Sequence, residues 1–75
     1  MKITGTSSYV KIEYNGKTVK ASGEMIVGGF VAFKNTMKAW EPPHESDEFN
    51  NDILEDIIQA VIEYCMNQDF KVKFE

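Results

Sequence analysis

The chain contains no arginine, one cysteine, one histidine and no long apolar run. Arginine is the residue that forks around phosphates, so its absence disfavours nucleic-acid binding. A lone cysteine, Cys65, excludes an internal disulfide, and its place among apolar residues predicts a buried, unreactive thiol. The longest uncharged apolar stretch, Met25 to Phe33, is too short to cross a bilayer, and the first residues do not resemble a signal sequence. We therefore expect a soluble, cytoplasmic protein without membrane contact.

Catalytic and metal chemistry also lack the side chains that they need. A nucleophile system places a base beside Ser or Cys, and a zinc site takes three or four ligands. The only histidine, His44, stands outside any recognisable motif and is expected in a solvated loop. Gly28-Gly29 lacks the lysine and the following helix of a phosphate loop, which favours a turn. Carboxylates such as Asp52 with Glu55 or Asp56 would repel one another on an exposed helix and stay ionised. We expect no enzyme activity, no metal and no cofactor.

The length predicts one domain, residues 1–75. A chain of this size buries only about 60% of its unfolded surface, so almost every large side chain is needed in the core. A deep catalytic pocket would remove atoms from that core, whereas binding at the surface would not.

The strongest periodic pattern predicts a helix over Ile53 to Met66. Its apolar residues recur at steps of three and four, which builds a wide stripe along one side of a helix. No second helical pattern exists, so the stripe must pack on β-strands. Ser46 or Asp47 is expected to cap the helix. The opposite side is polar and carries Glu48, Asp52, Glu55, Asp56, Gln59 and Glu63.

A β-hairpin is predicted around Asn15-Gly16, because both central residues of a tight hairpin turn need positive φ. With a two-residue loop, the numbers of paired residues sum to 31. Apolar pairs then share one face and mostly polar pairs the other, which supports this register. The apolar pairs are Ile12 with Val19 and Val10 with Ala21; the others are Lys11 with Lys20, Glu13 with Thr18 and Tyr9 with Ser22.

The remaining β-patterned segments complete a small sheet. Glu24 to Phe33 is either a second hairpin or one strand continued through a bend, with a bulge at Gly23 or at the glycine pair. Phe70 to Phe74 alternates as a last strand. We predict an α+β fold: a small antiparallel sheet of four to five strands, packed on one face by a single long helix, in the order strands, helix, strand. Further short segments are a first strand at Ile3, a turn at Lys34 to Thr36 and a return toward the sheet at Met37 to Trp40.

Charge is divided sharply along the chain. Residues 1–38 carry six lysines against two acids, and residues 39–70 carry nine acids and no lysine. Acids on an exposed helix side are explained by solvation alone. They also create a field that attracts a cationic partner, such as the basic cleft of an enzyme that acts on nucleic acid. Both interpretations remain open.

The run Trp40-Glu41-Pro42-Pro43-His44 has two interpretations as well. In the structural one, Trp40 plugs an end of the core and the prolines direct the chain into the helix. In the functional one, an aromatic residue beside charges on a stiff loop forms a recognition surface. The predicted partner-binding residues are Trp40, Glu41, His44, Glu48, Asp52, Glu55 and Asp56.

Several of these features together resemble a family of bacterial polymorphic-toxin immunity proteins, immunity protein 74. The resemblance spans residues 9–74, and its most specific part is the run from Trp40 to His44. It departs from the family pattern at Lys38 and Ala39, where arginines are expected, and in a more acidic helix. The other matching features are Tyr14 before Asn15-Gly16-Lys17, Val19, Gly23-Glu24, Gly28-Gly29-Phe30-Val31, Phe33, the amphipathic helix and the short final strand.

The resemblance implies a non-enzymatic cytoplasmic protein that binds and neutralises one toxin domain, a nuclease being one candidate, by occluding its active or substrate-binding surface. It transfers no catalytic residues. Two alternatives stand beside it: a small homodimeric structural or regulatory interaction module without a toxin partner, and a small enzyme that uses a carboxylate pair. For the leading hypothesis we expect a monomer or a weak homodimer.

Overall fold

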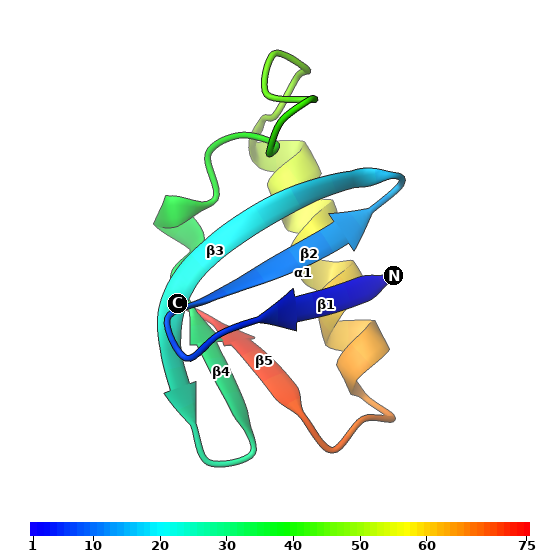
Figure 1. Ribbon diagram of the computed structural model, residues 1–75. Coiled ribbons are helices and arrows are strands. Elements are labelled where there is room, and N and C mark those ends of the chain that lie inside the picture. The colour runs from blue at the N-terminus through cyan, green and yellow to red at the C-terminus, as the bar shows by residue number, and fades with distance from the viewer.

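The computed structural model describes all residues, 1–75, as a five-stranded sheet and one α-helix (Figure 1). The predicted α+β class and the order strands, helix, strand are confirmed. Neither helical segment has the length and apolarity needed to span a bilayer. The elements are β1 (Lys2–Gly5), β2 (Tyr9–Tyr14), β3 (Lys17–Ile26), β4 (Gly29–Ala32), the 3₁₀-helix η1 (Lys34–Thr36), α1 (Asn51–Cys65) and β5 (Lys71–Phe74).

The strands lie side by side in chain order, so β1 and β5 form the two edges of the sheet. Neighbours are antiparallel from β1 to β4, but β5 runs parallel to β4. The sheet is therefore mixed, whereas the sequence analysis predicted a wholly antiparallel sheet. A parallel neighbour requires a long crossover, usually through a helix, and the connection through α1 provides it.

The first hairpin has the predicted register at every pair, including Val10 with Ala21 and Ile12 with Val19. Its turn residues Asn15 and Gly16 have φ values of 52° and 80°. Asparagine and glycine tolerate this left-handed conformation better than other residues, which is why their occurrence together locates the turn.

Strand β3 changes neighbours at Gly23. It pairs with β2 up to Ser22 and with β4 from Gly23 onward. A Cβ atom at Gly23 would collide with the carbonyl oxygen of Val31 and the ring of Phe30, so only glycine fits this crossing point. The predicted second hairpin is present, with Val27 and Gly28 as its turn residues.

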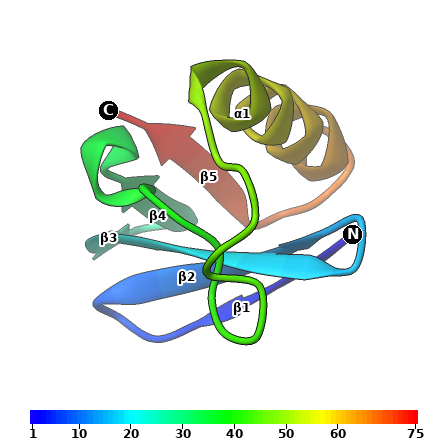
Figure 2. The same ribbon diagram turned by 90° about the horizontal axis from the view of Figure 1, so that it is seen from above.

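The helix covers one side of the curled sheet, and the core lies between them (Figure 2). Ile57 and Val61 of α1 pack with the sheet, and Cys65 is buried in the same cluster, as predicted. Full burial of an isoleucine or valine side chain contributes about 1.5–3 kcal/mol. The twelve buried residues of the core are Val10, Ile12, Val19, Ala21, Phe30, Ala32, Met37, Trp40, Ile57, Val61, Cys65 and Val72.

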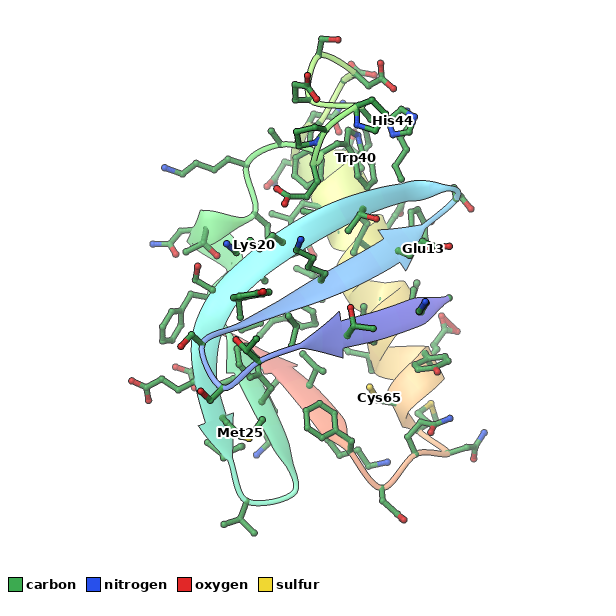
Figure 3. All side chains as sticks on the ribbon, viewed as in Figure 1. Glu13, Lys20, Met25, Trp40, His44 and Cys65 are labelled. Carbon is green, nitrogen blue, oxygen red and sulfur yellow. The ribbon has the colours of Figure 1, made fainter.

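The outer side of the β1–β3 region carries polar side chains. A shallow depression there is lined by Lys2, Thr4, Lys11, Glu13 and Thr18. The half-buried ring of Tyr9 lies 4.4 Å from the ammonium of Lys20, which projects from the sheet in Figure 3. This side therefore offers no broad apolar surface for dimerisation. The large apolar side chains that remain exposed in the protein are Met1, Met25, Ile26, Val27, Ile62, Tyr64, Met66 and Phe70.

Candidate binding surface

Trp40 closes the end of the core next to the start of α1. It forms an isolated β-bridge with Val19, and only 5% of its surface is exposed. Its Nε1–H donates to the carbonyl oxygen of Glu48 at 2.9 Å, and its ring meets Phe49 edge to face at 5.1 Å. The structural interpretation of Trp40 therefore holds. Its buried ring is not accessible to a partner in this conformation. The other six predicted partner-binding residues therefore remain as candidates.

Two of those candidates, Glu41 and His44, lie in the loop that Trp40 anchors. The Glu41 N–H donates to the carbonyl oxygen of Thr18 at 2.7 Å, and the His44 N–H donates to that of Glu41 at 3.0 Å. The Glu41 carboxylate lies 3.8 Å from the ammonium of Lys11. Both side chains are half-buried, so each has a face available for contact. The intervening Pro42-Pro43 peptide bond is cis.

The helix is capped by Asn50, whose side-chain oxygen accepts from the Ile53 N–H at 2.9 Å. The expectation that Ser46 or Asp47 performs this role is wrong. Asp47 instead lies 2.9 Å from the Lys17 ammonium, and Phe49, whose ring packs on Trp40, also precedes the first helical residue, Asn51.

The contact with Lys17 also alters the ionisation of Asp47. The hydrogen bond from Lys17 lowers the pKa of the Asp47 carboxyl, and the positive charges of Lys17 and His44 act in the same direction. Partial desolvation opposes them. The Lys17 ammonium also lies 5.6 Å from the centre of the Trp40 ring, so this lysine connects the first hairpin turn with the Trp40 loop.

The four remaining candidates, Glu48, Asp52, Glu55 and Asp56, are all exposed around the N-terminal half of α1. Three of these four acids line hollows on opposite flanks of α1. Glu48 and Asp56 line one hollow, together with Lys17. Glu55 lines another on the opposite flank, formed with Lys34, Asn35 and the terminal Glu75.

The chemistry available at this surface is that of charged contact. Histidine, cysteine and acidic side chains do not gather in groups of three or more that could hold a metal ion. No polar or charged residue is buried in the core. Carboxylates that are exposed and solvated suit electrostatic attraction to a partner.

A second surface was missed by the sequence analysis. An apolar hollow of about 330 Å³ opens between β1 and the C-terminal end of α1. It is assembled from segments distant in the chain, including Ile3, Met25, Tyr64 and Phe70. No signal in the sequence indicated this surface, because residue type alone does not separate exposed apolar residues from those of the core.

Comparison with curated proteins and with solved structures gives no match. The family model for immunity protein 74 matches residues 2–75, from the first strand to the last residue. The chain belongs to the immunity protein 74 family.

Proposed function

We propose that the protein binds and neutralises a cognate bacterial toxin domain by occluding its active or substrate-binding surface. Membership of an immunity protein family supports a toxin as the partner. In this proposal the protein is not an enzyme, and it acts in the cytoplasm of the cell that produces the toxin.

The observation that supports an electrostatic contact is the group of acids without an ion-pair partner around the start of α1. The chain contains two ion pairs, Lys11 with Glu41 and Lys17 with Asp47. None of the exposed acids Glu48, Asp52, Glu55 and Asp56 takes part in either pair. Unpaired charges of one sign attract an oppositely charged surface and raise the rate of encounter. A toxin whose cleft handles nucleic acid is basic, so a nuclease fits this surface.

The first experiment is to co-express the protein with the toxin domain encoded by the adjacent gene. Rescue of growth and a complex that survives purification are expected. Absence of both would sink the proposal.

The second experiment reverses the charge of Glu48, Asp52 and Glu55 to lysine. We expect the association rate with the toxin to fall by about tenfold or more, and its salt dependence to flatten. A matched control reverses Glu13, Glu24 and Glu63, which changes the net charge equally at exposed positions that line neither hollow at the start of α1. If both triple variants associate at the wild-type rate, the acidic surface is not the contact.

The two unpaired edges of the sheet, β1 and β5, favour a second candidate, a homodimeric interaction module. Sedimentation of the purified protein separates the two functions. A tight homodimer that fails to bind the toxin supports the module, whereas a monomer that binds the toxin supports the immunity protein.

A further inference from the structure

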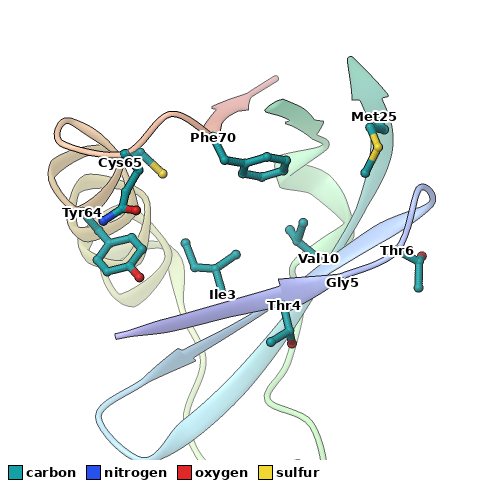
Figure 4. Close-up of a pocket in the computed structure, with 10 residues that line it drawn as sticks. Ile3, Thr4, Gly5, Thr6, Val10, Met25, Tyr64, Cys65 and Phe70 are labelled. Carbon is teal, nitrogen blue, oxygen red and sulfur yellow. The ribbon is translucent and has the colours of Figure 1, made fainter. Parts of the chain in front are cut away.

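The apolar hollow at the C-terminal end of α1 differs chemically from the other depressions in the molecule. Its six apolar lining residues are Ile3, Val10, Met25, Tyr64, Cys65 and Phe70, and none of its lining residues is charged (Figure 4). The other main depressions all include at least one charged side chain. The occupant that fits this hollow is therefore uncharged and apolar.

Three of the side chains around the hollow remain substantially exposed. The exposed fractions are 53% for Met25, 41% for Tyr64 and 42% for Phe70. They come from β3, α1 and the segment before β5, and they lie around the same hollow (Figure 4). Apolar groups that gather at one concave place mark a contact site more strongly than apolar groups scattered singly.

One wall of the hollow is the free edge of β1. The Thr6 N–H donates to the Tyr9 carbonyl at 2.9 Å, so the antiparallel register turns the backbone groups of Lys2 and Thr4 toward β2. The backbone groups of Ile3 and Gly5 point the other way, where no strand pairs with them. Both residues line the hollow. The edge thus presents unpaired hydrogen-bonding groups directly beside apolar surface.

We propose that an extended segment of the toxin adds to the free edge of β1 and places an uncharged apolar side chain in the hollow. This inference rests on the proposed function, because it takes the toxin as the partner. A small apolar molecule would fill the space but would leave the Ile3 and Gly5 backbone unpaired. An added strand satisfies both requirements, since its backbone pairs with the edge while alternate side chains enter the hollow.

In this proposal, the two surfaces affect different rate constants of toxin binding. The acids at the N-terminal half of α1 govern the rate of encounter, while the hollow at the C-terminal end governs the rate of dissociation. Because different rate constants report on them, the two contacts are separable by experiment.

The first test introduces a charge into the hollow at exposed positions, with Tyr64→Lys and Phe70→Lys. Ile62→Lys is the matched control, because Ile62 is 44% exposed on the same helix but does not line the hollow. We expect the two hollow variants to weaken toxin binding by about tenfold or more through faster dissociation. We expect the control to change affinity by less than about twofold. Wild-type dissociation rates in both hollow variants would overturn the inference.

The second test needs no substitution. Amide hydrogen exchange of the wild-type protein should be fast at Ile3 and Gly5 and should slow by about tenfold or more when the toxin domain binds. The Thr6 amide, already bonded to Tyr9, is the internal control. Unchanged exchange at Ile3 and Gly5 in the complex would exclude strand addition. Protection that appears at high protein concentration without toxin would assign the edge to a second copy instead.

The outcomes separate this inference from the function on which it rests. If the toxin does not bind the wild-type protein, the proposed function fails. If it binds and only the variants of Glu48, Asp52 and Glu55 weaken it, the function stands and strand addition is wrong.

Discussion

The two ends of α1 meet the sheet in contrasting ways. The end of α1 that starts at Asn51 is closed. There, Trp40 and Phe49 cover the core, and Lys17 contacts the loop through its ion pair with Asp47. The end of α1 that finishes at Cys65 is open. There, Tyr64 and Phe70 line a hollow that no part of the chain fills. Large aromatic residues therefore serve two purposes in this small domain. Those of the closed end complete the fold, whereas Tyr64 and Phe70 at the open end leave 41% and 42% of their surface exposed.

The contrast also assigns a role to the most distinctive run in the sequence. Trp40 begins that run, and its burial and its hydrogen bond to Glu48 make it part of the architecture. A residue in an unusual stretch of sequence is therefore not automatically a contact residue. Substitutions at the two ends should separate stability from binding.

The largest expected loss of stability is that of the Trp40→Ala variant, which changes the closed end. Removal of a buried tryptophan costs about 3–5 kcal/mol, a large share of the stability of a domain that has about 5–15 kcal/mol in total. Tyr64→Ala at the open end should cost less than about 1 kcal/mol, because much of that ring is already in water. Urea denaturation of both variants measures the difference. Equal losses would show that the two ends contribute alike to stability.

A smaller loss is expected for Trp40→Phe. A smaller aromatic ring remains in place of the indole, and the Nε1–H that donates to the Glu48 carbonyl disappears. An unsatisfied partner in a part-buried site costs about 1–3 kcal/mol. The shift of the urea midpoint measures this hydrogen bond, and a midpoint equal to that of the wild type would show that packing alone anchors the loop.

The start of the helix gives a third measure of the closed end. Asn50→Ala removes the cap of α1 and should cost about 1 kcal/mol, whereas Ser46→Ala should be close to neutral. Thermal unfolding distinguishes them. The opposite ranking would place the helix start earlier in the chain than Asn51.

The smallest effect concerns Asp47 and pH. Its pKa is lower in the folded protein than its ordinary value of 3.8, so the contact stabilises the fold above that pH. This contribution is lost as the pH falls below 3.8 and through the lower folded value. Titration of the carboxyl carbon by NMR measures the pKa, which should return toward its ordinary value in Lys17→Met. If the substitution leaves the pKa unchanged, the ion pair does not form in solution.

Much of the fold follows from short-range patterns. Asn15-Gly16 needs no distant partner to set its turn, and the register of the first hairpin follows by counting residues. The stripe on α1 predicts which side is buried. The direction of β5 was not predictable in this way, because the alternation of Phe70 to Phe74 suits either edge of the sheet and either direction.

The candidate surface was predictable in composition but not in arrangement. The helical period places Asp52, Glu55 and Asp56 on the solvent side, where the structure has them. Their division between two flanks depends on where Lys17 and Lys34 arrive from other elements. The cap was mispredicted because several residues before the helix can accept from its free N–H groups, and tertiary contacts at Asp47 and Phe49 decide among them.

The change of neighbours at Gly23 has a consequence for how the molecule comes apart. Strand β3 supplies hydrogen bonds to β2 in one half of its length and to β4 in the other, and neither half of the sheet is complete without it. Loss of this one strand would release both halves at once. We therefore expect a single cooperative melting event, in which no half-molecule survives as a stable intermediate.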